Sequence, residues 1–356
     1  MIRQIAAERL LNQQLARPGL AHVDDLVAWF GVVQAQEYTA ARWALALRMR
    51  GNVTADALER AFNDGRIVRT HVLRPTWHFV AAADVGWLLQ LSREHVHRRM
   101  AYAYRYYGLD PATRVRAAGL FERALGDGTH LTRRELGAYL ERRGMKAKGI
   151  SLALMTIYAE LEGIMCSGAQ RGRDATYALL STRVPSRRAV SRDESMAELT
   201  RRYLRSHAPA TIRDFAWWSG LSTKDVKRGL EIIGATDDVV DGHRYWRGSK
   251  VPSRRQSRSV VHLVPIYDEY LVAYRDHGAV PRVGGARYAL GPALIVDGQV
   301  AGAWKPVVAN DTVVVNVKTD RRLTTPERAA LEHAVERYGR HLKKTTSLVV
   351  KTQTRS

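Results

Sequence analysis

The chain has 356 residues, 46% of them hydrophobic, which is enough to bury the cores of two to four packed units. Lysine and arginine outnumber aspartate and glutamate by 56 to 35, and this charge of +21, spread along the chain, favours nucleic acid over an anionic membrane surface as the partner. No apolar run is long enough to span a bilayer, no signal peptide opens the chain, and the single cysteine, Cys166, excludes a disulfide framework. We therefore expect a cytoplasmic, nucleoid-associated protein without a metal or cofactor.

The first part of the chain predicts helices and then a hairpin. Hydrophobic periodicity predicts amphipathic helices, in chain order, over residues 2–15, 22–33, 39–49 and 54–65. Thr54 is a candidate N-cap for the fourth helix. Residues 67–81 are rich in Val, Thr, Trp and Phe and are interrupted by Pro75, which predicts two short strands around a turn. Helices followed by a small hairpin are the outline of a winged helix.

This outline recurs twice. After Gly144 a second helix leads to residues 169–182, a possible wing. Further on, Thr211 is placed to cap a helix, Gly220 to end it, and Asp241-Gly242 to turn a hairpin. We expect three tandem winged-helix units over residues 1–110, 111–184 and 193–248. Polar, basic linkers are expected at residues 185–195, before the third unit, and at residues 247–259, after it.

In the last third of the chain, hydrophobic residues recur at every second position, the period typical of strands. Residues 260–275, 293–306 and 311–319 read as strands, with Asp297-Gly298 as a hairpin turn, and Thr325-Pro326 opens a final helix. This pattern predicts a small β-rich domain over residues 258–356 that resembles a barrel. The predicted fold class is therefore α+β.

Two glutamines, Gln34 and Gln36, stand at the junction between two predicted helices. Residues two apart face opposite ways on a helix but share a face in an extended segment. Two amide groups on one face can hold a water by its protons, whereas at a helix end they can cap the backbone, and the spacing leaves both roles open. The neighbouring Glu37 is either a carboxylate of the same site or a solvent-facing residue at a helix N-terminus.

Three polar residues, Arg74, Thr76 and His78, occupy alternate positions of the first predicted hairpin. In a strand they share one face, which could meet phosphate or a base edge or could simply be solvated. Further on, residues 93–108 interleave arginines with four tyrosines. That composition suits unpaired or flipped bases, but packing of the tyrosines on a helix is the favoured interpretation.

Five further arginines are candidates for DNA contacts or for support of the site. Arg69 lies in the first predicted hairpin, and Arg171 and Arg173 lie in the second. Arg282 and Arg287 flank a Gly-Gly pair, in a segment that could follow a DNA groove or could be an ordinary surface loop.

Several motifs together resemble one family. They are VVQAQEYTAARWALALR (residues 32–48), RIVRTHVLRPTWHFV (66–80), LVPIYDEYLVAY (263–274) and LIVDGQVAGAW (294–304). In this order, over essentially the whole chain, they resemble the bacterial winged-helix DNA glycosylases of the AlkZ and YcaQ type, whose hallmark is the Gln-x-Gln stretch. A glutamine at the second position of this stretch resembles the AlkZ branch, since the YcaQ branch has aspartate at that position. Pro75 departs from the glycine expected before Thr-x-His.

The resemblance implies a monofunctional glycosylase that excises alkylated purines, including those of interstrand crosslinks, with Gln34 and Gln36 as the catalytic pair. It implies tandem winged helices in a C shape with a β-domain. The expected partner is double-stranded DNA bearing alkylated bases, bound by a monomer. The alternatives are a winged-helix DNA-binding protein without catalysis, such as a regulator, and a family member whose activity has decayed. A repressor usually dimerises on a palindrome, and the chain has no obvious dimerisation element.

Overall fold

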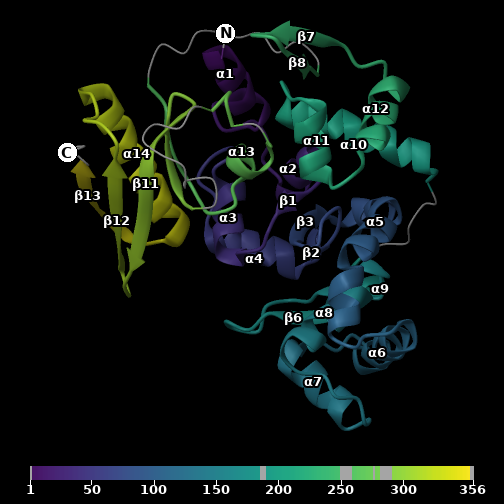
Figure 1. The fold of residues 1–356 in the computed structure, drawn as a ribbon. Coiled ribbons are helices and arrows are strands. Elements are labelled where there is room, and N and C mark those ends of the chain that lie inside the picture. The colour runs from purple at the N-terminus through teal and green to yellow at the C-terminus, as the bar shows by residue number, and fades with distance from the viewer. Residues whose placement is uncertain (1, 185–189, 249–258, 276, 281–290, 353–356) are drawn as a thin grey trace.

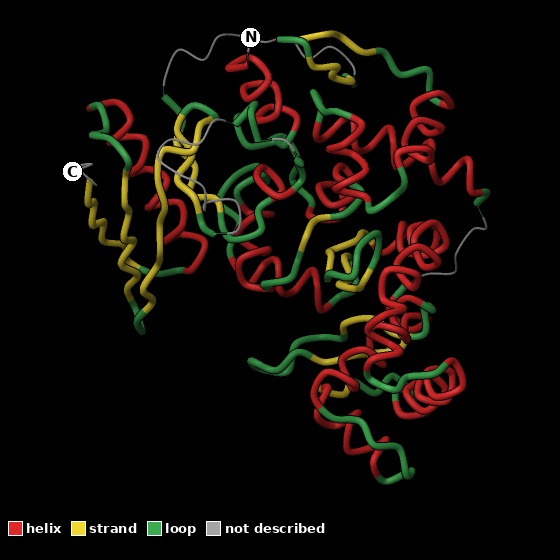
Figure 2. Tube along the Cα trace, in the orientation of Figure 1, coloured by secondary structure: helices red, strands yellow, loops and turns green. Residues whose placement is uncertain are grey.

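A computed structural model describes residues 2–184, 190–248, 259–275, 277–280 and 291–352. Helices and strands are both abundant, which confirms the α+β class (Figures 1 and 2). Arg282 and Arg287, most of the second predicted linker and part of the first lie outside the described residues. No helix in the described ranges is long and apolar enough to cross a membrane.

The N-terminal part contains the first predicted hairpin. Its elements are α1 (Ile2–Asn12), α2 (Val23–Phe30), β1 (Val33–Gln34), α3 (Tyr38–Ala46), α4 (Ala55–Asn63), β2 (Ile67–His71) and β3 (Trp77–Ala81). The Thr54 hydroxyl accepts a hydrogen bond from the Ala57 amide at 3.3 Å, so the predicted N-cap is confirmed. β1 pairs with β3, giving a sheet of order β1-β3-β2.

The same succession follows in a second segment. α5 (Val85–Tyr106) and α6 (Pro111–Ala124) lead into β4 (Leu131–Thr132), α7 (Arg133–Glu141), α8 (Gly149–Leu161), β5 (Met165–Ser167), β6 (Thr176–Leu179) and the short α9 (Leu180–Arg183). The sheet order is β4-β6-β5, which is the pairing of the first sheet repeated. Figure 1 shows α6, α7 and α8 projecting as a lobe from the rest of the molecule.

The third segment repeats two helices and a hairpin. It comprises α10 (Arg192–His207), α11 (Ile212–Ser219), α12 (Thr223–Ile232), β7 (Asp237–Val240) and β8 (His243–Trp246). Thr211 caps α11 and Gly220 ends it with a left-handed φ of 72°, as predicted. Ser222 caps α12. Ala210 bridges to Trp246 in the position that a short third strand occupies in the other two sheets.

The last part is an open sheet, so the barrel-like expectation was wrong. Its elements are β9 (Val261–Val264), α13 (Glu269–Val272), β10 (Ala293–Val296), β11 (Gln299–Val308), β12 (Thr312–Thr319), α14 (Thr325–Leu342) and β13 (Thr345–Thr352). The sheet order is β13-β12-β11-β10-β9. β13, which the sequence pattern did not predict, returns after α14 and pairs parallel to β12, so it extends one edge and does not close the sheet.

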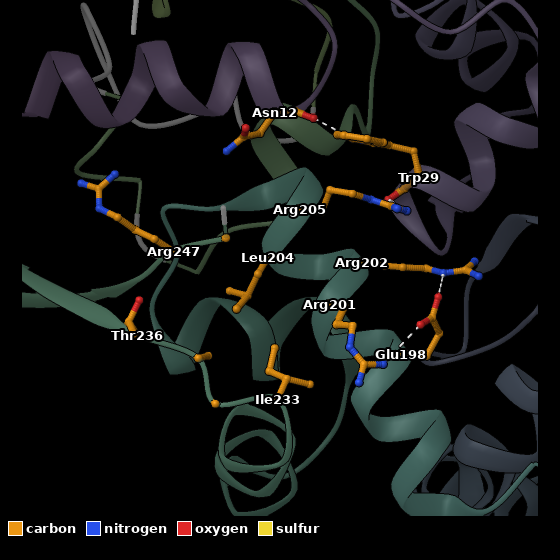
Figure 3. Close-up of a pocket in the computed structure, with 13 residues that line it drawn as sticks. Asn12, Trp29, Glu198, Arg201, Arg202, Leu204, Arg205, Ile233, Thr236 and Arg247 are labelled. Carbon is orange, nitrogen blue, oxygen red and sulfur yellow. Dashed lines mark hydrogen bonds and ion pairs between the residues drawn. The ribbon is translucent and has the colours of Figure 1, made fainter. Parts of the chain in front are cut away.

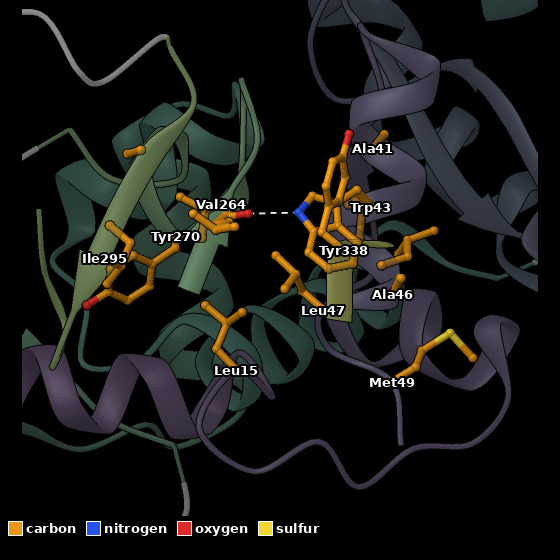
Figure 4. Packing of buried hydrophobic residues seen from close by; sticks show 14 of the residues in the cluster. Leu15, Ala41, Trp43, Ala46, Leu47, Met49, Val264, Tyr270, Ile295 and Tyr338 are labelled. Carbon is orange, nitrogen blue, oxygen red and sulfur yellow. Dashed lines mark hydrogen bonds between the residues drawn. The ribbon is translucent and has the colours of Figure 1, made fainter. Parts of the chain in front are cut away.

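The predicted strand over residues 260–275 was also partly wrong, because after β9 the chain turns into α13. The Asp268 carboxylate accepts from the Tyr270 amide at 2.9 Å and caps this short helix. One hydrophobic core joins the N-terminal elements to the C-terminal sheet (Figure 4), and Trp43, Val264 and Tyr338 belong to it. A second core joins the start of α5 to α10–α12, and a third holds the end of α5 with α6–α8.

Candidate functional site

Gln34 and Gln36 lie outside both neighbouring helices. α2 ends at Gly31, whose φ of 86° disfavours side-chain-bearing residues, and α3 begins at Tyr38. Gln34 pairs with His78 across β1 and β3, and the Ala35 amide continues this pairing by donating to the Trp77 carbonyl at 2.7 Å. The two glutamines therefore occupy an extended segment alongside β3, and neither side chain caps a helix.

The amide oxygen of Gln34 is held by Arg74. Arg74 Nη2 donates to Gln34 Oε1 at 2.9 Å and approaches His78 Nε2 at 3.4 Å. The Gln34 side chain is buried, with only 8% of the residue exposed. One guanidinium nitrogen thus joins the first glutamine to the histidine that lies opposite it in the sheet.

The His78 imidazole is neutral and has a defined tautomer. Its Nδ1 lies 2.9 Å from the Thr76 carbonyl, which can only accept, so Nδ1 carries the proton and Nε2 accepts from Arg74. Burial, together with the adjacent Arg74 charge, lowers the pKa of His78 to about 3. At neutral pH this histidine is therefore a hydrogen-bond acceptor for Arg74 and not a proton donor to substrate.

The Gln36 side chain is held by β3. The Trp77 amide donates to Gln36 Oε1 at 3.3 Å. Arg69, which is buried, donates to the carbonyls of Ala35 at 2.8 Å and Gln36 at 3.2 Å, and its guanidinium lies 3.9 Å from the centre of the Trp77 ring. Arg69 therefore supports the backbone of the glutamine segment from behind.

The expectation that Arg74 and Thr76 share a strand face with His78 was wrong, because residues 72–76 form the turn between β2 and β3. Leu73 has a φ of 59°, a conformation that is costly for a buried leucine. His95 Nε2 donates to the Leu73 carbonyl at 2.7 Å, so α5 holds the turn in this strained shape. The strain is located beside the residue that orients Gln34.

Glu269 is a buried residue of the site that the sequence pattern does not predict. Its carboxylate accepts hydrogen bonds from the backbone amide of Gln34 at 2.7 Å, from Trp218 Nε1 at 2.9 Å and from His207 Nε2 at 3.3 Å. Burial alone would raise its pKa, but the hydrogen bonds from His207 and Gln34 and the charge of Arg74 bring the pKa to about 2. The ionised carboxylate fixes the backbone of Gln34.

Two polar side-chain atoms at the site are buried without a partner among the described residues, namely Arg74 Nε and Thr76 Oγ1. Nor does any described residue accept a hydrogen bond from the side-chain Nε2 atoms of Gln34 and Gln36, whose Oε1 atoms are both engaged. Buried polar groups are normally satisfied by protein or by ordered water. The cluster therefore retains hydrogen-bonding capacity for water or for a bound molecule.

Other candidate residues lie apart from this cluster. Glu37 is exposed at the N-cap of α3 and makes no capping hydrogen bond, as its solvent-facing alternative predicted. Arg171 and Arg173 are exposed in the hairpin between β5 and β6, where Arg171 forms two hydrogen bonds with Glu135 at 2.9 and 3.0 Å. No group of three or more potential metal ligands occurs within the described residues.

A cavity of about 610 Å³ lies between α2, α10 and the segment after α12 (Figure 3). Four arginines line it, but most of their charge is matched. Arg202 pairs with Asp84 and Glu198, and Arg247 pairs with Glu8 and Asp238. Because none of the glutamine-site residues lines this cavity, it is separate from the site.

Comparisons with known proteins agree with one another. The family model described as DNA glycosylase AlkZ-like matches residues 27–341. An interstrand DNA cross-link repair glycosylase of Streptomyces sahachiroi is 24% identical over 352 residues, covering 90% of this chain and 92% of that protein. The solved structure of the Streptomyces sahachiroi DNA glycosylase AlkZ has the same fold, with a TM-score of 0.76 and 21% identity over 98% of this chain and 99% of that one. Since the family model spans most of its length, the chain belongs to the AlkZ-like DNA glycosylases, hydrolases that act on N-glycosyl bonds.

Proposed function

We propose that this protein is a monofunctional DNA glycosylase for purines alkylated at N7 or N3, including those in interstrand crosslinks, and that Gln34 and Gln36 position the attacking water. The observation that carries the proposal is the placement of both glutamines on one extended segment. There Arg74 and the Trp77 amide hold the two amide oxygens toward the same hairpin.

The chemistry asks little of an acid or a base. A purine alkylated at N7 or N3 is cationic and becomes neutral when its bond to C1′ breaks, so the leaving group needs no protonation. Water adds its oxygen to C1′ and releases a proton to solvent, which leaves an abasic site. Each amide oxygen keeps a second lone pair for a water proton. Two such dipoles orient the water and stabilise positive charge on the sugar.

The surrounding residues supply a rigid frame for this water. Arg74 and the His78 acceptor fix the Gln34 side chain, Glu269 fixes its backbone, and Arg69 fixes the carbonyls of the segment. A preorganised site loses little free energy to reorganisation when charge develops. The neutral His78 and the fully engaged Glu269 act as positioning residues under this proposal.

The monofunctional assignment rests on the absence of lysine contacts to the site residues in the described part of the chain. A glycosylase that also cleaves the strand attacks with an amine and forms a Schiff base. No lysine makes a hydrogen bond or an ion pair with any site residue in the described part of the chain. Water is therefore the nucleophile in the proposed reaction.

We further propose that the three strand–helix–helix–hairpin segments are winged helices arranged in a C shape around duplex DNA, and that the protein acts as a monomer. Support comes from the repeated sheet orders β1-β3-β2 and β4-β6-β5 and from the bridge of Ala210 to Trp246. The charge of +21 complements a phosphate backbone. The AlkZ structure, which has the same fold, is named a DNA glycosylase.

The test is excision by the wild-type chain on a panel of duplexes. The panel contains 7-methylguanine, a crosslink between N7 atoms of two guanines, and undamaged DNA. Abasic sites are expected on both damaged duplexes and not on the undamaged one, and borohydride should trap no covalent complex because no Schiff base forms. Tight binding that leaves both lesions intact would sink the enzyme proposal and favour a DNA-binding protein without catalysis.

A further inference from the structure

The outward face of α5 carries a stripe of exposed tyrosines and arginines. Arg98, Arg99, Tyr102, Arg105 and Tyr106 are all exposed. Their spacings of three, four and seven residues place them on one side of the helix. The opposite side carries Tyr104, which is 3% exposed and packs in the third core. The stripe is therefore the solvent side of a helix whose inner face is fully used.

The exposure of two tyrosines contradicts the favoured expectation that these residues pack on the helix. Tyr102 is 70% exposed and Tyr106 is 69% exposed. Their ring centroids lie 6.0 Å apart at an interplanar angle of 25°, so the two rings stack loosely on each other while most of each side chain stays exposed. Neither ring contributes to a core, and the fold gives no reason for aromatic residues at these positions.

The arginines beside the tyrosines keep their charge available. No carboxylate within the described residues forms an ion pair with Arg99 or Arg105. Arg98 meets Glu94 only at 4.0 Å, and both side chains are at least 75% exposed, so this pair is worth little in water. The stripe therefore combines aromatic faces with a net positive charge.

The stripe continues toward the N-terminal end of α5 into a hollow beside the middle of the helix. A cavity of about 360 Å³ lies where α5 meets the turn between α11 and α12. Arg98 and Arg99 line it, as do Glu94 and an Arg192–Asp225 ion pair at 3.3 Å. From His95, which also lines it, to Tyr106 the helix rises about 17 Å at 1.5 Å per residue. That length matches roughly five nucleotides stacked at about 3.4 Å.

We propose that this face of α5 is a track for unpaired nucleotides, with bases stacked on Tyr102 and Tyr106 and phosphates held by the arginines. A tyrosine on a convex helix can stack only on a base whose face is uncovered, which an intact duplex does not offer away from its ends. Aromatic rings with basic neighbours are the usual combination in proteins that hold single strands. The track goes beyond excision and does not depend on it.

The composition of the stripe argues against a protein partner. Tyrosine and arginine also serve as anchors in protein interfaces, but such interfaces surround them with a buried apolar centre. Here the side chains between the anchors are alanines, Ala101 and Ala103, and the neighbouring charges are mainly positive. A polyanion with exposed rings fits this surface better than a folded protein does.

The test measures binding of the full chain to labelled single strands of about 12 nucleotides by fluorescence polarisation. The probes are oligothymidylate, oligouridylate and an abasic strand of the same length. Replacing both tyrosines with alanine (Tyr102→Ala, Tyr106→Ala) should weaken oligothymidylate binding about tenfold or more and leave abasic-strand binding unchanged. Tighter binding of one sugar type in the wild type would assign the track to DNA or to RNA.

Three controls keep the result interpretable. Replacing both tyrosines with phenylalanine keeps the rings and should retain affinity, whereas Ile150→Ala removes an exposed apolar side chain from α8 of the same lobe and should change nothing. Urea unfolding of the alanine variant should match the wild type, since both rings are exposed. The proposal would be overturned if the alanine variant kept the wild-type affinity for oligothymidylate. It would also be overturned if the wild type bound the abasic strand as tightly as oligothymidylate. Excision on an intact duplex stays unaffected either way.

Discussion

Replacement of Arg74 by methionine isolates the group that orients Gln34. Methionine keeps much of the length and apolar volume of the arginine stem but has no donor. In the variant Gln34 Oε1 loses its contact at 2.9 Å, and His78 Nε2 loses its donor at 3.4 Å. Because Glu269 still binds the backbone amide of Gln34, the backbone of the site should stay in place while the Gln34 side chain becomes free to rotate.

The magnitude follows from the strength of one charge-assisted hydrogen bond. Such a bond contributes about 1.5–3 kcal/mol, which corresponds to a decrease of roughly tenfold to a hundredfold in the excision rate. The same change removes a positive charge that lowers the pKa of His78, so that pKa should rise from about 3.

The assay is single-turnover excision of 7-methylguanine from a duplex, with DNA affinity measured separately. The rate constant should fall while the dissociation constant changes little, because this arginine faces the protein interior. The His78 pKa can be followed by NMR of the imidazole protons in both proteins. Excision within twofold of wild type in Arg74→Met would refute the view that a fixed Gln34 side chain is needed.

Three further predictions concern the frame of the site. Glu269→Gln presents an amide hydrogen to one of the donors around this buried side chain, so the free energy of unfolding in urea should fall by about 2–3 kcal/mol. The exposed control Glu336→Gln should change that free energy little. His95→Ala removes the hydrogen bond to the Leu73 carbonyl and should slow excision about fivefold without weakening DNA binding. An equal loss of affinity for DNA would contradict a positioning role for His95. Because His78 and His262 have pKa values of about 3 against about 6.5 when unfolded, the unfolded chain binds more protons between these values, and stability should fall as pH drops through this window. The fall should approach about 1.4 kcal/mol per pH unit for each histidine, and His262→Leu should reduce the slope of urea midpoints measured from pH 7 to 4.

Local patterns predicted much of the fold. The caps at Thr54, Thr211 and Ser222 and the turn at Asp297-Gly298 depend on neighbouring residues, so the sequence displays them directly. β13 escaped prediction because its partner β12 precedes a whole helix, and parallel pairing at that distance leaves no local signal. The open edge of the sheet depends on the same long-range contact.

The site was predictable in its residue types but not in its supports. Gln34 and Gln36 stood out because they lie at a junction between two predicted helices, and His78 because it occupies an alternate position of a predicted hairpin. Glu269, Arg48 and Glu160 did not, since a lone charged residue is expected to be solvated until the fold buries it. Arg48 pairs with Asp268 at 2.6 Å, and Glu160 accepts from Trp77 Nε1 at 3.3 Å, across 220 and 83 residues of chain. One usable signal was the adjacent pair Asp268-Glu269 within an apolar run.

The water-positioning role of the two glutamines is tested most directly by single-turnover rate constants of Gln34→Ala and Gln36→Ala on a duplex containing 7-methylguanine. The exposed Gln90→Ala on α5 is the matched control, and Glu37→Gln tests the adjacent carboxylate. Both site variants should lose about tenfold to a thousandfold in rate while retaining DNA affinity, and both controls should equal the wild type. Full activity in Gln34→Ala and Gln36→Ala, with damage still excised, would contradict the assignment of these residues as the catalytic pair.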